Sequence, residues 1–336
     1  MSRGAETMRR SALFALALAL AGCGKLDQEA MVLTVEPGWA AEIAAGGKDG
    51  FASPDGLHWA GGTLYVADEG GSAVRAWKPG TRPALLAGSE AGLASPEDLV
   101  RDSAGNLYFT DDTRGGLWRT DGAGRTTALV EPGRGLPSTE GLGLSPSGDL
   151  VVGDAPGHRV LKVTRDGSVS VLLGPERRIA KPESFAFDDA GNLYIADNRD
   201  NVLYRLTTNG ALHRTIADRP GFSPESLLFA GGALFITDSD NGKLFRYTPD
   251  DGLTVVAIFG GTLANVQGVA ADEKGALYIS VQSDLKGRKG YILKLSRKDP
   301  SNRAHDRQAV GRALAPAPRR LGANLKEKAQ RREGTT

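Results

Sequence analysis

The stretch that decides the fold is "ESFAFDDAGNLYIADNRDNVLYRLTTNGALHRTIA", residues 183–217. Apolar and polar residues alternate in four short runs, as they do in half-buried strands. Turn signals such as Ala190-Gly191 and Asn209-Gly210 separate the runs. The stretch therefore predicts four consecutive antiparallel strands joined by tight turns.

The same unit recurs along the chain. A leucine of its second strand returns at intervals of 43, 43, 43, 41 and 43 residues: Leu64, Leu107, Leu150, Leu193, Leu234 and Leu277. A glycine two residues before each leucine supplies the positive φ of a tight turn: Gly62, Gly105, Gly148, Gly191, Gly232 and Gly275. A period in the low forties with four strands per unit is typical of a propeller blade. The six units predict an all-β, six-bladed β-propeller with four-stranded blades.

The ring must also close, because a free edge strand promotes aggregation. The sixth unit ends after its third strand, Tyr291 to Leu295, and lacks a fourth. Residues 40–45 have the composition of a fourth strand, so we expect Ala40 to Ala45 to pair with Tyr291 to Leu295. The propeller is then predicted over residues 39–297.

The N-terminal segment has the pattern of an export signal. Basic residues precede a short apolar run, "ALFALALALA" at 12–21, within a predicted signal peptide of residues 1–22. The run ends in "LAGC", which resembles the lipobox of bacterial lipoproteins, and Cys23 is the only cysteine. The resemblance implies lipidation of Cys23 and a membrane-anchored, exported protein, with the outer membrane favoured because Gly24 follows the cysteine. The alternative is an ordinary signal peptide with an incidental cysteine.

Two further segments flank the predicted propeller. Residues 23–38 would be a tether, and Met31–Val35 allows a short strand there. Residues 298–336 carry ten basic and four acidic residues, net +6, which favours disorder. This tail is either a solvated extension or an electrostatic contact with anionic headgroups or cell-wall polymers. The whole chain has a net charge of only +1, so nucleic acid is not expected as a partner.

Acidic residues recur where each first strand begins, nearest to the propeller axis. Five of the six positions are acids: Asp55, Glu97, Glu140, Glu183, Glu225 and Gln267. A proline precedes four of them and fixes the backbone at the strand start. Sixfold pseudosymmetry predicts that these side chains form a ring around the mouth of the central channel.

Such a ring needs compensation for its charge. Two carboxylates about 8 Å apart at an effective dielectric constant near 20 repel each other by about 2 kcal/mol. A hard cation such as calcium, raised pKa values with shared protons, or backbone NH groups together with Lys181 could supply it. The simplest alternative is that each acid binds the backbone of its own blade.

A second set of acids ends the second strands of five units: Asp68, Asp111, Asp154, Asp197 and Asp238. These aspartates are expected to be structural and to accept hydrogen bonds from NH groups of the turn that follows. No G-x-S-x-G, CxxC or phosphate-loop motif is present, and the four histidines share no metal-ligand spacing.

The units resemble NHL repeats, as in "LYIADNRDNVLYRL" at 193–206 and "VVGDAPGHRVLKV" at 151–163. More widely, residues 39–297 resemble the superfamily of six-bladed propellers that contains senescence marker protein, gluconolactonase and paraoxonase. "PDGLHW" at 54–59 is similar to that family's opening Glu-Gly-Pro-x-Trp, and "KPESFAFD" at 181–188 resembles strictosidine-synthase-like proteins. Many unrelated activities share this scaffold.

The resemblance implies a divalent cation, most often calcium, at the channel mouth. Its ligands would be the strand-start side chains of blades one, three, four and five: Asp55, Glu140, Glu183 and Glu225. The family places Glu at the first position and Asn at the middle two, so this chain departs at three positions. Four anionic ligands would bind calcium but weaken its power to polarise a carbonyl. The family's catalytic acid or nucleophile falls on Glu225.

Two hypotheses for function follow. The first, which we favour because the ring is so uniformly acidic, is a lipid-anchored binding platform for a small molecule, a glycan or a protein. The second is a metal-dependent hydrolase of lactones or esters, with Glu225 as its catalytic residue.

Overall fold

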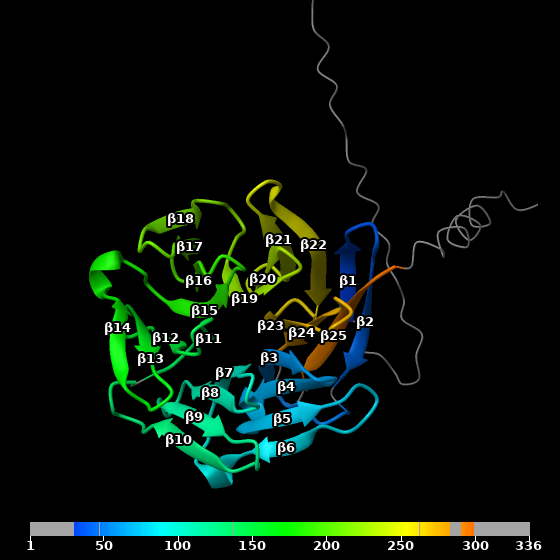
Figure 1. Cartoon of the computed structure of the whole chain (residues 1–336). Coiled ribbons are helices and arrows are strands. Elements are labelled where there is room, and N and C mark those ends of the chain that lie inside the picture. The colour runs from blue at the N-terminus through cyan, green and yellow to red at the C-terminus, as the bar shows by residue number, and fades with distance from the viewer. Residues whose placement is uncertain (1–29, 47, 137, 262, 283–289, 299–336) are drawn as a thin grey trace, which may run out of the picture. The chain divides into compact units, whose positions relative to one another are not determined.

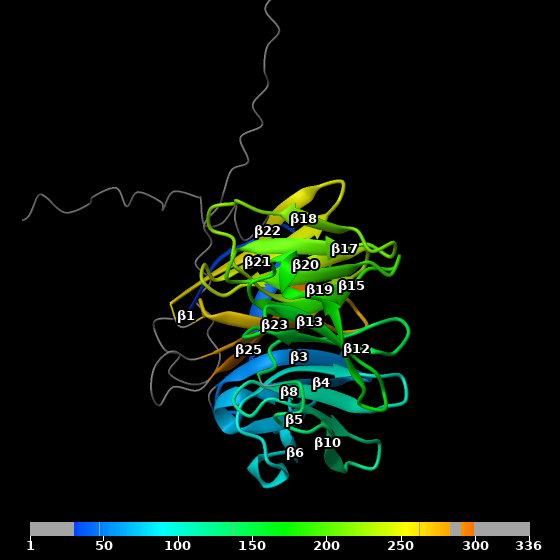
Figure 2. The ribbon, with the colours of Figure 1, turned by 90° about the vertical axis from the view of Figure 1, so that its left-hand side faces the viewer.

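The computed structural model describes residues 30–46, 48–136, 138–261, 263–282 and 290–298. Over these residues, six antiparallel sheets are arranged as the blades of one ring (Figure 1). A view turned by 90° shows the sheets from the side of the ring (Figure 2). The prediction of an all-β, six-bladed propeller is confirmed. The predicted signal peptide, Cys23 and the tail beyond Lys298 lie outside the described residues.

Each blade contains four strands named here from the axis outward, and in blades one to five they follow chain order. Blade one contains β3 (Pro54–Ala60), β4 (Thr63–Asp68), β5 (Ala73–Trp77) and β6 (Ala84–Ala87). Blade two contains β7 (Pro96–Arg101), β8 (Leu107–Asp111), β9 (Leu117–Thr120) and β10 (Thr126–Val130). Blade three contains β11 (Leu142–Leu144), β12 (Leu150–Asp154), β13 (Arg159–Val163) and β14 (Val169–Leu173). Blade four contains β15 (Pro182–Phe187), β16 (Leu193–Asp197), β17 (Val202–Leu206) and β18 (Leu212–Ile216).

Blade five contains β19 (Pro224–Ala230), β20 (Ala233–Asp238), β21 (Lys243–Thr248) and β22 (Gly252–Gly261). Blade six contains β23 (Val266–Ala271), β24 (Leu277–Val281), β25 (Tyr291–Arg297) and β2 (Trp39–Ala45). The described residues also form three short 3₁₀ turns: η1 (Glu69–Gly71), η2 (Ser89–Ala91) and η3 (Pro175–Arg177). Among the described residues, no helix is long and apolar enough to cross a membrane.

The ring closes as predicted, because β2 from the N-terminal side is the fourth strand of blade six. It runs antiparallel to β25, with Ala41 opposite Leu295 and Ala45 opposite Ile292. A single sheet therefore joins the two ends of the propeller, and its hydrogen bonds hold the ring closed.

A short strand is also present where the sequence allowed one. β1 (Ala30–Val35) adds a fifth strand to the outer edge of blade five, antiparallel to β22. Ala30 lies opposite Gly261, at the end of the blade where the chain leads on to the first strand of blade six. We call the end of the ring where the first strands begin the mouth face. β1 therefore begins on the mouth face, whereas β25 ends at Arg297 on the opposite face.

The repeat leucines and glycines have the structural roles that their spacing predicts. All six leucines are at most 2% exposed, and they pack in apolar clusters, of which several join residues of two neighbouring blades. Burial of a leucine side chain contributes about 1.5–3 kcal/mol. The six turn glycines have φ between 74° and 92°, which costs a residue with a Cβ free energy. The repeat therefore fixes the core and the turns together.

Candidate functional site

The predicted ring residues all lie at the mouth face, within or just before the first strand of their blade. Asp55, Glu140, Glu183 and Gln267 are 7–9% exposed, while Glu97 and Glu225 are partly buried. Among the described residues, no hydrogen bond joins any of the five carboxylates to the backbone of its own blade. The described contacts of these carboxylates are to side chains, some from the same blade and some from a neighbouring blade.

Hydrogen bonds between blades hold the ring backbone in place. The hydroxyl of Thr110 in β8 donates to the carbonyl of Glu140 in the next blade at 2.7 Å. Ser280 in β24 donates in the same way to the carbonyl of Asp55. Each blade that has this hydroxyl therefore fixes the ring residue of its neighbour.

The aspartates that end the second strands are fully buried, and they do more than the sequence predicts. Four of the five accept a bond from the following turn, for example from the Arg114 NH to Asp111 at 2.8 Å. Four also accept bonds from the loop that enters the first strand of the same blade; Asp68 binds the Ala52 and Ser53 NH groups at 2.9 and 2.8 Å. They therefore position the loops that carry the ring acids.

A second ring, which the sequence reading missed, surrounds the first. It is formed by the residue that directly follows the end of each second strand: Glu69, Asp112, Ala155, Asn198, Ser239 and Gln282. Three of these side chains bind a first-ring acid: Asn198 and Gln282 bind the acid of the next blade, and Ser239 binds the acid of its own blade. The Asn198 and Ser239 side chains both donate to Oε2 of Glu225, at 2.6 and 2.8 Å. These positions share the period of the repeat leucines, which is the signal that could have revealed them.

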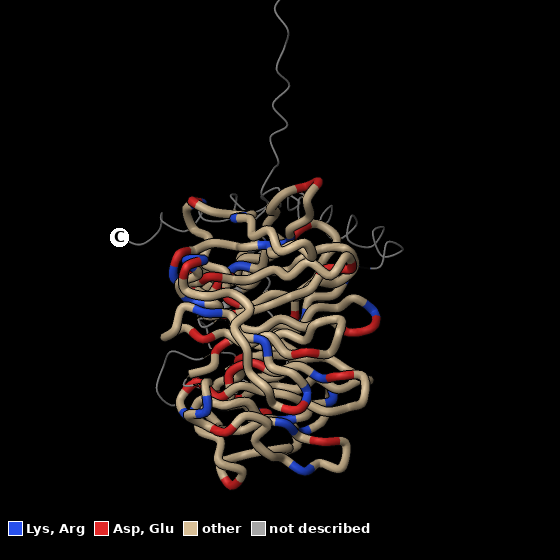
Figure 3. The backbone as a smooth tube through the Cα atoms, turned by 60° about the vertical axis from the view of Figure 1, so that its left-hand side comes forward, with Lys and Arg blue, Asp and Glu red and all other residues tan. Residues whose placement is uncertain are grey.

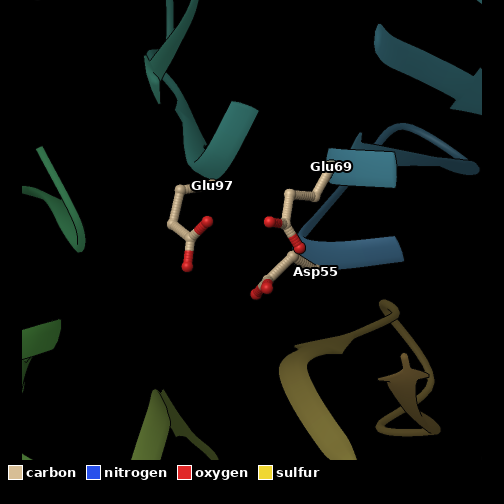
Figure 4. A group of neighbouring side chains, drawn as sticks. All are labelled: Asp55, Glu69 and Glu97. Carbon is tan, nitrogen blue, oxygen red and sulfur yellow. The ribbon is translucent and has the colours of Figure 1, made fainter. Parts of the chain in front are cut away.

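Three carboxylates of the two rings converge. Asp55, Glu69 and Glu97 each offer an oxygen that lies within 4.8 Å of the others, and their side chains point toward one another (Figure 4). The Gln282 amide donates to Asp55 at 2.6 Å and to Glu69 at 2.7 Å, and the Ser95 hydroxyl donates to Glu69 at 3.1 Å. Among the described residues, no hydrogen bond or ion pair involves the Glu97 carboxylate. We call the first ring, together with the side chains of neighbouring loops that reach it, the collar. Asp55, Glu69 and Glu97 form its open half.

Burial and repulsion by neighbouring carboxylates raise the pKa values of Asp55 and Glu97. Burial raises the pKa of Asp55 well above its usual range, and the charges of Glu225 and Glu69 raise it further. Burial likewise raises the pKa of Glu97, with Asp55 and Glu140 adding to the effect. Ionisation of Asp55 and Glu97 is therefore unfavourable unless a positive charge lies close to them.

Lys181 neutralises the other side of the ring. Its ammonium forms an ion pair with Glu183 and lies 3.7 Å from Glu140. Burial alone would lower the pKa of Lys181, but Glu183 and Glu140 raise it, so the side chain is positively charged. Burial raises the pKa values of both glutamates, and Lys181 opposes that shift. We call Glu140, Glu183 and Lys181 the paired half of the collar.

Glu225 and Gln267 complete the ring between these halves. Burial raises the pKa of Glu225, and the Ser239 hydrogen bond and the Lys181 charge oppose the rise. Gln267 is uncharged and donates to the Asn265 side chain at 2.7 Å. Of the metal ligands expected from the resemblance, only Asp55 belongs to the convergent cluster. Glu140 and Glu183 pair with Lys181, and Glu225 binds two neutral donors, so the four-ligand set stays a prediction.

The convergent cluster has the chemistry of a calcium site. Calcium takes about six to eight oxygen ligands at about 2.3–2.6 Å, so two oxygens on opposite sides of the ion lie about 5 Å apart. A limit of 4.8 Å between the oxygens of Asp55, Glu69 and Glu97 is within that span. Along the backbone of the propeller as a whole, acidic and basic residues are interspersed (Figure 3).

No protein-family model and no curated protein matches the chain. Solved propellers match its structure. A gluconolactonase from Xanthomonas campestris superposes with a TM-score of 0.66 at 17% identity, over 86% of this chain and 99% of that chain. The calcium-binding protein regucalcin from Agrobacterium tumefaciens has a TM-score of 0.62 at 17% identity, over 76% and 93%. A virginiamycin B lyase from Staphylococcus aureus gives 0.59 at 15%, over 77% and 100%.

These similarities show a shared architecture. The chain has the six-bladed propeller fold of gluconolactonase-like proteins, as the repeat motifs predict. At these identities the fold is the property in common, and the residues at the channel mouth carry the argument about function.

Proposed function

We propose that this propeller binds a divalent cation, with calcium favoured, at the open half of its collar, and acts as a lipid-anchored binding platform outside the cytoplasm. The observation that carries the proposal is the convergence of Asp55, Glu69 and Glu97. These three carboxylates are buried or half-buried and repel one another. A cation bound between them stabilises the folded protein, because attraction to the cation replaces that repulsion.

The small number of protein ligands explains how a bound ion would take part in binding a further molecule. Asp55, Glu69 and Glu97 each offer one convergent oxygen, which is fewer than the six to eight oxygens that calcium takes, so several coordination positions stay open for water or for oxygens of a ligand. A small molecule, a glycan or a protein side chain with carboxylate or hydroxyl oxygens could fill them. The cation would thereby turn an anionic collar into a receptor for oxygen-rich ligands.

Thermal unfolding with and without calcium tests this proposal. Calcium at a hundredfold over its dissociation constant should stabilise the protein by about 2.7 kcal/mol. Glu69→Gln should abolish that gain, while Asp112→Asn, at the equivalent position of blade two, should preserve it. Equal gains in both variants, or no gain in the wild-type protein, would refute a calcium site at Asp55, Glu69 and Glu97.

Strand β1 supports a particular attachment geometry. Ala30 begins β1 on the mouth face, and residues 24–29 separate it from Cys23. Even fully extended, this link spans only about 25 Å. A lipid on Cys23 would therefore tether the propeller by its mouth face, with the outer membrane as the favoured location. Mass spectrometry of the exported protein tests the lipid: the mature chain should begin at a Cys23 that carries acyl chains.

A second candidate function is a metal-dependent lactonase or esterase. The gluconolactonase among the structural neighbours favours it, as does Glu225, whose Oε2 accepts two hydrogen bonds while burial keeps its pKa raised. A raised pKa favours a carboxyl group in the role of general acid or base. If this activity exists, Glu225→Gln should fold but lose turnover of aryl esters or lactones, and a chelator should abolish wild-type turnover. Absence of turnover with calcium, zinc and manganese would eliminate this candidate.

A further inference from the structure

Lys181 occupies a position at which the other blades have small neutral side chains. Counting two residues back from each ring residue gives Ser53, Ser95, Ser138, Lys181, Ser223 and Asn265. Blade four is therefore the one blade that brings a cationic side chain to the collar at this position.

The hydroxyl at this position has a defined partner in two other blades. Ser95 donates to Glu69 at 3.1 Å, and Ser138 donates to Asp112 at 2.9 Å, each a second-ring residue of the preceding blade. The equivalent second-ring residue for Lys181 is Ala155, which has no side-chain oxygen. The longer Lys181 side chain reaches the first ring instead, where it meets Glu183 and Glu140. The exchange of Ser for Lys thus coincides with the loss of the second-ring acceptor.

Hydrogen bonds hold the backbone at Lys181 in place. Its backbone NH donates to the fully buried Asp197 at 3.0 Å, and the preceding Ala180 NH donates to the same carboxylate at 2.7 Å. The two glutamates are largely buried, with side chains 5% and 10% exposed. The ammonium therefore lies between two largely buried carboxylates, as a bound cation would.

We propose that Lys181 is a resident cation of the collar. Its ammonium takes the place between Glu140 and Glu183 that a metal ion would otherwise occupy, and it thereby confines exogenous divalent cations to Asp55, Glu69 and Glu97. This inference deepens the proposed cation site and rests on it. Because the ammonium is covalently attached, it competes at every calcium concentration and keeps two metal ions from binding close together.

Calcium stoichiometry, measured by isothermal titration on the folded protein, tests the proposal. The wild-type protein should bind one ion per chain, and Lys181→Met should bind two. Lys181→Gln, which can still donate a hydrogen bond to Glu183, provides a second neutral variant if the methionine variant folds poorly. Lys181→Arg keeps the charge and should bind one ion. In the double variant Lys181→Met with Glu69→Gln, one ion should remain, in the paired half.

The outcomes separate this inference from the proposed function. If the wild-type protein binds no calcium but the neutral Lys181 variants bind one ion, the site at Asp55 fails and the role of Lys181 is supported. If folded Lys181→Met and Lys181→Gln bind no more calcium than the wild-type protein, Lys181 does not exclude a metal and the inference is wrong. A second ion in the wild-type protein or in Lys181→Arg would also overturn it.

Discussion

Each half of the collar contains two acids from the starts of first strands, but the two halves differ in what lies beside those acids. In the paired half, Glu140 and Glu183 share the ammonium of Lys181. In the open half, the donors to Asp55 and Glu69 are neutral, namely the Gln282 amide and the Ser95 hydroxyl, and Glu97 has no described partner. Sixfold repetition therefore dictates where acids gather, whereas single loop residues decide how each group is neutralised.

The largest expected effect is a pH dependence that the open half dominates and calcium removes. Asp55, Glu97, Glu140, Glu183 and Glu225 all have raised pKa values, so the folded protein binds more protons than the unfolded chain above the ordinary pKa of a carboxyl group. Folding stability should then fall as the pH rises, because ionisation of these groups is less favourable in the folded protein.

Urea unfolding in a chelator at pH 5 and pH 8 measures that fall. Calcium at pH 8 should restore most of the loss, because the ion replaces the protons of the open half. A calcium-free protein that gains stability from pH 5 to pH 8 would contradict the raised pKa values and the comparison built on them.

A smaller effect should follow from making the paired half resemble the open half. Lys181→Met leaves Glu140 and Glu183 without their counter-charge, and removal of one partner from a buried ion pair costs about 3 kcal/mol. The loss should be large at pH 8 and smaller at pH 5, where the glutamates take up protons. Urea unfolding checks it against Lys274→Met, which removes an exposed lysine and should change little. Equal losses in the two variants would mean that the ion pairs contribute nothing.

The smallest effect has the opposite sign. Asp55→Asn removes one charge from the open half and keeps an oxygen that can accept from Gln282. In a chelator at pH 8 it should therefore stabilise the protein, by about 1–2 kcal/mol, because its neighbours lose a repulsive partner. The same substitution should abolish the response to calcium. Destabilisation in the chelator would show instead that the Asp55 charge is already compensated in the absence of a cation.

The sequence predicts most of the fold because the fold is periodic. Leu64 and its five equivalents fix the blade count, and the missing strand after Leu295 leads directly to the pairing with residues 40–45. The partner of β1 was not predictable in this way, since β1 lies outside the repeat. Its pairing with β22 depends on an edge that only the assembled blade presents.

The site was predictable in part for the same reason. The first ring follows from the period, but the second ring varies in residue type from Glu69 to Ala155 and Gln282, so a search for one kind of residue misses it. The proximity of Lys181 to Glu183 is apparent two residues away in the sequence. Its approach to Glu140 crosses from blade four to blade three and requires the three-dimensional ring. Convergence of Glu69 with Asp55 and Glu97 likewise depends on side-chain directions.

The most direct test of the central claim is the position of a bound calcium ion in crystals of the wild-type protein, located by its anomalous scattering. The account predicts one peak, coordinated by the carboxylates of Asp55, Glu69 and Glu97, with the Lys181 ion pairs intact. A peak between Glu140, Glu183 and Glu225 with Lys181 displaced, or no peak at saturating calcium, would contradict it.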